Sequence, residues 1–526
     1  MASSSRKGHF NMKSNSVALN EVAAVVGSVR KKGVKLWAVD GELRYKAPKG
    51  ALTAEEIERL RASKSQIAFL LERAKQPHGL GPRSLKDRAP ATFPQLVHWQ
   101  LHGLSSRPSV KQLASAIHLF GRVDVGVLQR SLNFIVDRHE ALRTRIEVID
   151  QVPEQRIDES GECRLIVDDL SQRLPSDPET EVRRIIDECI LEPVDFSKDR
   201  LFCLRWVKLR DDESVLILAM EHMISDAFSL NIFLRDLFST YRQLSAGHHV
   251  SLPEIPVQFA DYAEWQWASH PDWLEKNGDY WAERLRECGR IRFTDDQFSP
   301  SEACLGWGTA PVVMDKELKS ALRDWCRSRR TTLVMSVFTA YVALLLRWYA
   351  IDETVVRYQT DGRTDPKVQN TIGFFASCLH LRVHILPTDS LTDLLKKVTD
   401  EYCRACERMD FSYVEAQQPA PEFTRNGRFN WVPHGLLTDP SLSDDLPGIS
   451  CRPFAFTNPV LKRFDIDSEP TVLLYEHADE VVGGVHYSLK HFSSATMARF
   501  ARSFMCLVRA LLQEPQKPIR DIVLSQ

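Results

Sequence analysis

The stretch LAMEHMISDAFSL (218–230) gathers titratable side chains at the point where an apolar segment turns polar. His222 is its most reactive member, because imidazole titrates near neutral pH and can take a proton from an attacking nucleophile. Asp226 follows four residues later and could accept a hydrogen bond from the histidine, or pair with an arginine and brace the loop. A single histidine after a strand is more often an ordinary polar residue, so residue types alone leave catalysis open.

The elements around this cluster decide where its side chains point. SVLILAMEH (214–222) has the composition of a strand, in which successive side chains alternate between faces. One face would carry Val215, Ile217, Ala219 and Glu221, and the other would carry Leu216, Leu218, Met220 and His222. Glu221 and His222 are then not an acid–base dyad. A helix at 230–244 follows, with Ser229 as its expected N-cap, so His222 lies at a strand–loop–helix junction, where α/β sheets often present reactive groups.

Composition indicates a globular protein of more than one domain. The 526 residues suggest about two to four compact units, and 43% of them are hydrophobic. A net charge of −2 argues against a nucleic-acid-binding protein, which usually has a basic excess. The eleven cysteines follow no framework spacing and no secretory signal precedes them, so we expect reduced thiols in a cytoplasmic protein.

Several other chemistries find no support in the sequence. Cys403 and Cys406 form a close pair without a second pair, so no metal site is expected. Neither a Gly-x-Ser-x-Gly elbow nor a phosphate-binding loop is present. The longest apolar run, 331–346, is shorter than a membrane span and predicts a buried helix.

The first ninety residues divide into three parts. Residues 1–17 are expected to be a disordered N-terminus. Residues 18–75 predict a small α+β unit: a helix that ends at Gly33, a hairpin around Asp40–Gly41, a second helix that begins with a capping box of Thr53 and Glu56, and a third helix at 64–74. Residues 76–91 are rich in proline, glycine and charge, which indicates a linker.

The rest of the chain alternates strand-like and helix-like segments, as in an α/β fold. A break near 251–275 suggests two lobes. We assign the first lobe to residues 92–262 and the second to residues 263–526.

Several segments resemble the condensation domains of nonribosomal peptide synthetases, which belong to the chloramphenicol acetyltransferase-like superfamily. EHMISDAFS (221–229) is similar to their His-His-x-x-x-Asp-Gly motif. Further segments match in the same order over roughly residues 90–524: RHEALRT (138–144), DFSKDRLFCLRWVKL (195–209), FADYAEWQ (259–266), YWAERL (280–285), IGFFASCLHLR (372–382) and PQKPIRDIVLS (515–525). The resemblance implies a two-lobed chloramphenicol acetyltransferase-like α/β fold with a reaction chamber between the lobes.

The same resemblance assigns roles to the motif residues. His222 matches the functional histidine, which orients the attacking amine or takes its proton. Asp226 matches the structural aspartate, for which Arg143 is the expected arginine partner and Arg138 the reserve. Glu221 replaces the first histidine, and by strand alternation it should leave the chamber alone.

One other departure from the motif matters. Ala227 replaces the closing glycine, keeping the amide but restricting the backbone. Glu221, Asp226 and Ser229 also have the spacing of the Asp-x-x-x-x-Asp-x-x-Ser motif of heterocyclization domains, with glutamate in place of the first aspartate. Those relatives generally lack the histidine, so its retention favours simple condensation. An inactive carrier-binding platform and a transferase that uses a free amine or alcohol remain alternatives.

The second lobe offers candidates for the substrate channel. Ser377 stands where the family often has asparagine, and Asn430 and Trp431 lie where relatives build the channel floor. The resemblance implies no bound metal or cofactor, since both substrates travel on phosphopantetheine arms of donor and acceptor carrier proteins. Neither nucleic acid nor membrane is expected as a partner.

GVKLWAVDGELRYKAPKGALTAEEIERLRASK (33–64) resembles the tubulysin-type docking domain that begins subunits of hybrid polyketide–peptide synthases. In that family the hairpin captures the C-terminal tail of the preceding subunit. An exposed hairpin edge can add a strand, and basic side chains can attract an acidic tail. The hairpin residues expected to do so are Lys35, Trp37, Arg44, Tyr45 and Lys46. The donor would then arrive from another polypeptide.

Overall fold

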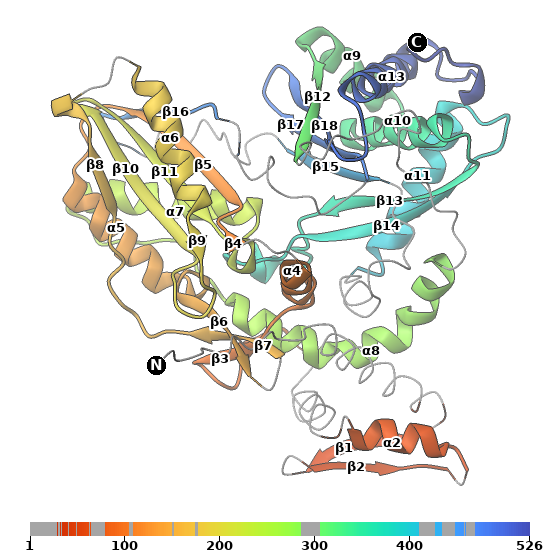
Figure 1. Ribbon diagram of the computed structural model, residues 1–526, viewed down its shortest axis with the longest axis horizontal. Helices are drawn as coiled ribbons and strands as arrows, with labels where there is room; N and C mark the ends of the chain where they lie inside the picture. Colours follow the sequence, from red (N-terminus) through yellow and green to blue (C-terminus); the bar gives the residue numbers. More distant parts are fainter. Residues whose placement is uncertain are drawn as a thin grey trace, which may run out of the picture.

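The structure, a computed structural model, describes residues 29, 32, 34–39, 42–48, 50–62, 64, 79–104, 109–149, 152–173, 177–285, 306–409, 427–433, 446, 448–456, 458 and 469–525. Two lobes stand side by side, each built on its own sheet, and helix α4 (Phe93–Leu104) lies between them (Figure 1). The expected disordered N-terminus lies outside the described residues.

The first lobe is a five-stranded sheet covered by helices on both faces. Its strands lie in the order β16 (Ser450–Pro453), β5 (Leu113–Phe120), β11 (Glu213–Met220), β10 (Phe202–Arg210) and β8 (Ile166–Asp169). Its helices are α5 (Val125–Arg138), α6 (Pro178–Leu191) and α7 (Ala227–Ser245). Because β11 is central, its side chains are buried on both faces.

The predicted alternation along β11 is confirmed. Leu216, Leu218 and Met220 belong to the apolar cluster formed with α5 and α7. Val215, Ile217 and Ala219 instead join the cluster that contains the buried face of α6. The strand ends at Met220, however, one residue before the motif glutamate. The motif itself therefore follows turn geometry, and alternation no longer fixes its side chains.

The second lobe contains a six-stranded sheet and the largest apolar core. Its strands lie in the order β12 (Trp307–Met314), β18 (Val481–Ser488), β17 (Thr471–Glu476), β15 (Arg428–Val432), β13 (Glu353–Thr360) and β14 (Ser377–His384). Its helices are α9 (Lys316–Ser328), α10 (Leu333–Trp348), α11 (Leu391–Cys406) and α13 (Ser494–Gln513). The buried helix predicted at 331–346 is α10, whose side chains are buried from Met335 to Leu346.

No single helix in the described ranges has the length and hydropathy to cross a membrane. Only α9 and α10 taken together, bent by 100° at their junction, reach that threshold of length and composition.

The predicted boundary between the lobes needs correction. The lobe boundary expected at 262/263 falls inside one continuous helix, α8 (Phe259–Leu285), which runs beneath both lobes (Figure 1). Strand β16 belongs to the second part of the chain but completes the sheet of the first lobe, through its antiparallel pairing with β5. No single cut in the sequence can separate the two lobes, because a strand from late in the chain is hydrogen-bonded into the sheet of the first lobe.

The linker expected at 76–91 is also more ordered than its composition suggests. Strand β3 (Arg88–Pro90) pairs with β7 (Val152–Ile157), which pairs in turn with β6 (Thr144–Ile149). The buried Arg83 forms ion pairs with Glu140 at 2.7 Å and Asp261 at 2.9 Å. These contacts fasten the later half of the segment to the first lobe and α8. A second short pairing joins β4 (Ser109–Val110) to β9 (Pro193–Val194).

The N-terminal unit contains the predicted hairpin and second helix. Strands β1 (Lys35–Val39) and β2 (Glu42–Lys46) pair antiparallel, with Val39 opposite Glu42. Helix α2 (Ala54–Ala62) begins with the expected capping box, in which the Thr53 hydroxyl accepts from the Glu56 amide and the Glu56 carboxylate accepts from the Thr53 amide. The helices expected at 17–33 and 64–74 lie almost entirely outside the described residues.

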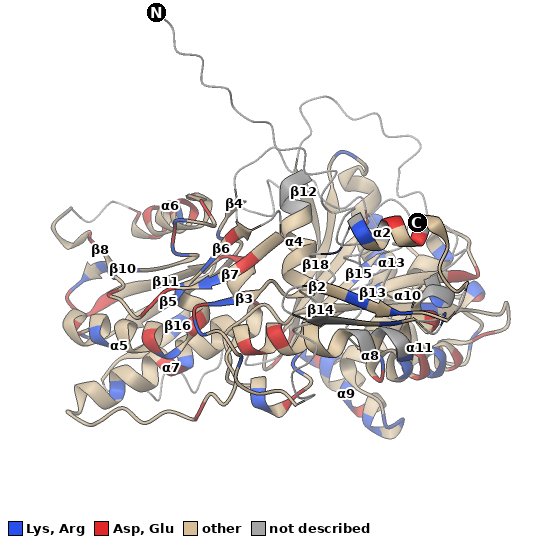
Figure 2. Cartoon of the chain, turned by 90° about the horizontal axis from the view of Figure 1, so that it is seen from below, with Lys and Arg blue, Asp and Glu red and all other residues tan. Residues whose placement is uncertain are grey.

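Charges of both signs are interspersed on the outer helices (Figure 2). On α6, for example, Arg184 forms ion pairs with Glu181 and Glu188 on the same helical face. Such exposed pairs contribute little to stability. Their mixture agrees with the nearly neutral net charge.

Candidate functional site

The motif forms a tight turn between the central strand β11 and helix α7. Residues His222–Ile224 make one turn of 3₁₀-helix, whose first amide groups are capped by the Glu221 carboxylate. The Ser225 hydroxyl donates to the Glu221 carbonyl at 2.8 Å. Asp226 then caps α7 by accepting from the Ser229 amide at 2.8 Å. The N-cap prediction for Ser229 is therefore wrong: an aspartate three residues earlier already offers its carboxylate, so the helix begins at Ala227.

His222 has one ring nitrogen engaged and one available. Its Nδ1 lies 3.1 Å from the Ser225 carbonyl oxygen. A carbonyl only accepts, so Nδ1 must carry the proton and Nε2 must hold the lone pair. Burial, followed by the charge of His98, lowers the pKa of His222 to about 4. The imidazole is therefore neutral at physiological pH and able to accept a proton through Nε2.

Glu221 is fully buried and bonded away from His222. Its Oε1 lies 3.1 Å from Nε2 of His98 and accepts from the Ser109 hydroxyl at 3.3 Å, while Oε2 accepts from the Met223 amide. Burial alone would raise the pKa of Glu221, but the charge and hydrogen bond of His98, with the Met223 amide, hold it below its ordinary value. Glu221 is thus an ionised structural carboxylate and forms no dyad with His222.

Glu221 is nevertheless connected to the surroundings of His222 through the residue that it binds. Its partner His98, on α4, has its ring centroid 5.8 Å from that of His222. The ring of Phe374 lies 4.9 Å from the His222 ring and 5.9 Å from the His98 ring. A residue bonded to Glu221 therefore borders the catalytic candidate.

The arginine partner of Asp226 is Arg363, and the prediction of Arg143 with Arg138 in reserve is wrong. Nη2 of Arg363 lies 2.9 Å from Oδ1 of Asp226, and both side chains are buried. Arg143 instead donates to the Asp158 carbonyl and lies 3.8 Å from Glu140. Both arginines of the 138–144 segment lie at or just after the end of α5, where they bind groups other than Asp226.

Arg138, the reserve, pairs with Asp236 at 3.2 Å. Arg363 follows β13 in the second lobe and reaches Asp226 across the boundary between the lobes. Gly362, immediately before it, has φ +66°, and an added Cβ would lie 1.9 Å from the Phe375 carbonyl oxygen. Glycine is therefore required there to aim Arg363 at Asp226.

Ser229 and Ala227 complete the junction at the start of α7. The buried Ser229 hydroxyl lies 2.8 Å from Asp226 Oδ1 and 2.9 Å from the Gly373 carbonyl oxygen, and it accepts from the Gly373 amide at 3.1 Å. Ala227 is the first residue of α7, in a helical conformation that alanine adopts readily. The replacement of the family glycine therefore introduces no backbone conflict.

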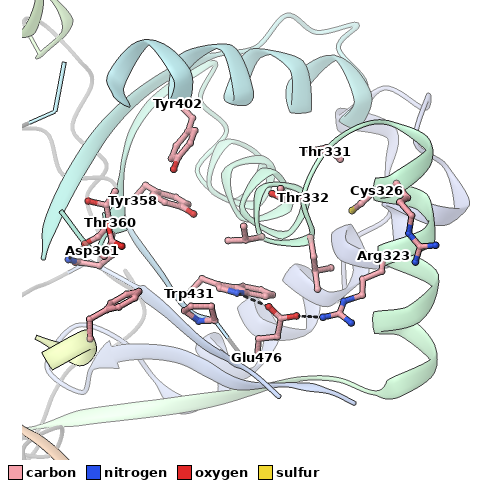
Figure 3. A pocket seen from close by; sticks show the side chains of 16 residues that line it. Arg323, Cys326, Thr331, Thr332, Tyr358, Thr360, Asp361, Tyr402, Trp431 and Glu476 are labelled. Carbon is pink, nitrogen blue, oxygen red and sulfur yellow. Dashed lines mark hydrogen bonds and ion pairs between the residues drawn. The ribbon is translucent and has the colours of Figure 1, made fainter. Parts of the chain in front are cut away.

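A cavity of about 570 Å³ opens at the end of the second-lobe sheet that faces α7. Trp431 lines it, as do Phe228 of α7 and Asp361, two residues from Asp226 and Arg363 respectively. Figure 3 shows the Trp431 indole directed at Glu476, whose carboxylate also binds Arg323. The indole Nε1 lies 3.3 Å from Glu476 Oε2, and Arg323 lies 2.6 Å from Oε1. Trp431 is therefore fixed in place as part of the cavity wall.

The other two channel candidates do not line this cavity. Ser377 begins β14, and its carbonyl accepts from the side chains of Gln359 and Thr360. Asn430 precedes Trp431 on β15, so its side chain points to the opposite face of the sheet. Tyr358 and Tyr402 line the cavity instead, and burial raises the pKa of Tyr358 to about 12.

The hairpin carries a basic face. Cross-strand neighbours share a face of a hairpin, and Lys35 lies opposite Lys46 while Trp37 lies opposite Arg44. The side chains of Lys35, Arg44, Tyr45 and Lys46 are exposed, whereas Leu36 is buried beside Leu60 of α2. The Trp37 side chain lies outside the described residues. Like charges placed opposite each other repel, so this face is suited to an anionic partner.

Sequence reasoning missed three site residues. Arg363, His98 and Phe374 come from segments more than one hundred residues from the motif in one direction or the other, and only the tertiary fold brings them to it. The one local signal is Asp361–Gly362 before Arg363, because that pair marks a tight turn.

Comparison with known proteins identifies both parts of the chain. Residues 85–431 match the condensation domain family, and residues 22–72 match the TubC N-terminal docking domain. Malpibaldin synthetase of Mortierella alpina is 27% identical over 457 residues, which cover 85% of this chain and 8% of that protein. Phosphinothricin tripeptide synthetase PhsC of Streptomyces viridochromogenes is 27% identical over 434 residues, which cover 81% of this chain and 39% of that protein. The chain thus spans a minor part of these relatives.

Solved structures share the two-lobed fold. The X-domain from teicoplanin biosynthesis superposes with a TM-score of 0.71 at 21% identity, covering 85% of this chain and 100% of that one. The starter condensation domain of rhizomide synthetase RzmA gives 0.69 at 15% identity, covering 84% and 98%. The expected chloramphenicol acetyltransferase-like fold is confirmed. The chain belongs to the condensation domain family, which is found in nonribosomal peptide synthetases, and it carries a TubC N-terminal docking domain at residues 22–72.

Proposed function

We propose that this chain joins an acyl or peptidyl thioester on an upstream carrier protein to the amine of an amino acid on a downstream carrier. The observation that carries the proposal is His222: a neutral imidazole with its proton fixed on Nδ1 by Ser225 and its Nε2 lone pair available. Two tethered substrates held beside it would react as if intramolecular, which alone can supply much of the rate.

The reaction balances with His222 as the only proton carrier. The amine nitrogen attacks the thioester carbonyl carbon, and Nε2 of His222 takes the proton that the nitrogen loses as the C–N bond forms. The C–S bond then breaks, and the departing sulfur receives that proton from the imidazolium. The products are an amide on the acceptor carrier and a free thiol on the donor arm. No bound cofactor takes part, because both substrates bring their own phosphopantetheine arms.

The cavity lined by Trp431 is a suitable binding site for the side chain of the acceptor amino acid. It is lined by aromatic rings, and it shares Phe228 with the helix that Asp226 caps. Ligand sites of this kind combine apolar walls with a few polar groups that fix orientation. Glu476 and Asp361 are the acidic members of the wall.

The basic hairpin supports delivery of the donor from another polypeptide. Lys35, Arg44 and Lys46 are exposed, and among the described residues β1 and β2 pair only with each other, so an acidic tail could add to the hairpin. That the protein is located in the cytoplasm is a prediction from the sequence.

The experiment is intact-mass analysis of an acceptor carrier loaded with cysteine or serine, after incubation with this chain and an acyl-loaded donor carrier. We expect the acceptor to gain the acyl mass, and a chain carrying His222→Gln to leave it unloaded. Gain of the acyl mass less one water would instead establish heterocyclization. The geometry favours condensation, because Glu221, Asp226 and Ser229 are all buried and hydrogen-bonded within the protein.

No acyl transfer across varied carriers and substrates, with both carriers shown to bind, would mean that the chain is an inactive platform. Product formed with a free amine and without an acceptor carrier would indicate a stand-alone transferase.

A further inference from the structure

A partly buried contact between a glutamate and a histidine takes the place of the first histidine of the family motif. Glu221 occupies that position, its side chain has no exposed surface, and its Oε1 lies 3.1 Å from Nε2 of His98. A carboxylate only accepts, so the proton between the two groups is carried by His98. The imidazole that this chain lacks in the motif is thus supplied from α4, the helix between the lobes (Figure 1).

His98 is held in a defined position beside His222. Glu221 fixes its Nε2, and Phe374 contacts it edge-on, with an interplanar angle of 85°. The same Phe374 ring lies 4.9 Å from the ring of His222. The two imidazoles therefore border one aromatic side chain, at 5.8 Å from each other.

We propose that His98 is a positioning residue for His222, acting through the buried Glu221 carboxylate and through its own charge. The proposal deepens the proposed function, and its kinetic test rests on it. His98 has two effects: it binds a carboxylate that is adjacent to His222 in the chain, and its interaction with the His222 ring opposes a positive charge on that ring.

The charges that face His222 can be named element by element. Its own turn contributes Glu221, α4 contributes His98, and the first turn of α7 contributes Asp226. Behind Asp226 stands Arg363, which balances that carboxylate at 2.9 Å. Glu221 and Asp226 favour the protonated imidazole, whereas burial and His98 oppose it. Because Asp226 has its own cation, His98 is the group that balances Glu221.

Removal of His98 would therefore leave an ionised carboxylate unbalanced beside His222. The histidine would then hold a proton at higher pH, since an opposite charge within a few ångströms shifts a pKa by about 1 to 3 units. Removal of Glu221 together with His98 cancels both charges. The double variant should thus return His222 close to its original behaviour.

The test is an NMR titration of the full chain with isotope-labelled histidine, in which the His222 resonance is identified by its loss in His222→Gln. We expect His222 to titrate near pH 4 in the parent, about 1 to 3 units higher in His98→Gln, and near the parent value in His98→Gln/Glu221→Gln. The exposed His248→Gln serves as the matched control, with no shift expected. An unshifted His222 in His98→Gln would overturn the proposal.

If a variant does not fold, the proposal can still be tested by the NMR spectrum of the parent protein. At neutral pH, the nitrogen spectrum should show protonated Nε2 on His98 and unprotonated Nε2 on His222. The reverse pattern, or an imidazolium at His222, would contradict the proposal.

The kinetic readout separates this inference from the proposed function. The acid limb of product formation should move upward in His98→Gln by the same number of pH units as the NMR titration. A loss of rate that is equal at every pH would indicate a merely structural role and overturn the proposal. Absence of product from the parent would instead refute the proposed function, while the titration would still decide the role of His98.

Discussion

Nη2 of Arg363 lies 2.9 Å from Oδ1 of Asp226, and this buried ion pair joins a loop of the second lobe to the first turn of α7. The other carboxylate oxygen accepts from the Phe375 amide at 3.1 Å, and Arg363 also donates to the carbonyls of Val368 and Thr371. The motif aspartate therefore fastens a loop of the second lobe to the start of α7, and its carboxylate is bound by groups of the protein.

Asp226→Ala should destabilise the protein because it leaves the Arg363 guanidinium buried without its anion. We expect the free energy of unfolding to fall by about 3 to 5 kcal/mol, measured by chemical denaturation. In a double-mutant cycle, Asp226→Ala and Arg363→Met should be non-additive, whereas Asp226→Ala and Arg143→Met should be additive. Equal coupling for both arginines would contradict the assignment of Arg363.

His222→Gln should abolish turnover without unfolding the chain. Loss of a general base lowers rates by about 10²- to 10⁴-fold, while an amide side chain can still donate toward the Ser225 carbonyl. The measurement combines product mass with a thermal melt. His248→Gln, on the exposed surface, is the control and should retain full turnover. Unchanged turnover in His222→Gln would remove His222 from the chemistry.

The pH dependence of activity should reflect the low pKa of His222. Because the imidazole is protonated only near pH 4, the rate should stay level as the pH falls from neutrality and decline only as it approaches about 4. An enzyme whose catalytic histidine kept its ordinary pKa of 6.5 would already lose activity as the pH falls below that value. Initial rates over this range, with the melting temperature followed in parallel, distinguish the two.

The same residue should contribute to the pH dependence of stability. Between pH 6.5 and about 4 the unfolded chain binds a proton at His222 that the folded chain does not. The free energy of unfolding therefore falls as the pH falls through this window, and the contribution is fully present above it. Denaturation of the parent and of His222→Gln at several pH values should show a shallower slope in the variant.

Reversal of charge on the hairpin should weaken capture of an upstream tail. Arg44→Glu with Lys46→Glu replaces attraction by repulsion, and we expect at least about a tenfold weaker affinity for an acidic C-terminal peptide, measured by calorimetry. Arg61→Glu on α2, where an exposed arginine pairs with Glu58, is the matched control. Turnover of a small thioester donor should not change in either variant, because that donor needs no docking.

Trp431→Ala should impair use of the acceptor. Loss of a large aromatic wall should raise KM for the acceptor carrier by about tenfold, which corresponds to about 1.4 kcal/mol, with a smaller effect on kcat. Ser377→Ala should leave both constants unchanged, since that residue does not line the cavity. Steady-state kinetics with varied acceptor side chains would test this, and an equal effect of both substitutions would contradict the assignment.

Local sequence patterns were sufficient to predict several features of the structure. Alternation along 214–220 placed its side chains on two faces, and the capping box at Thr53 marked a helix start. The order of the motifs led to the family and to His222. These features depend on neighbouring residues and on the periods of strand and helix, so they can be read from the chain.

The surroundings of His222 depend on the tertiary fold. Arg363, His98 and Phe374 reach the motif from remote segments, and strand β16 crosses to the first lobe through hydrogen bonds that no local pattern specifies. Arg143 was the wrong partner for Asp226 because a guanidinium pairs with the carboxylate that the fold brings within reach. Packing likewise decided that Glu221 faces His98, because the strand that would have oriented the glutamate ends one residue earlier.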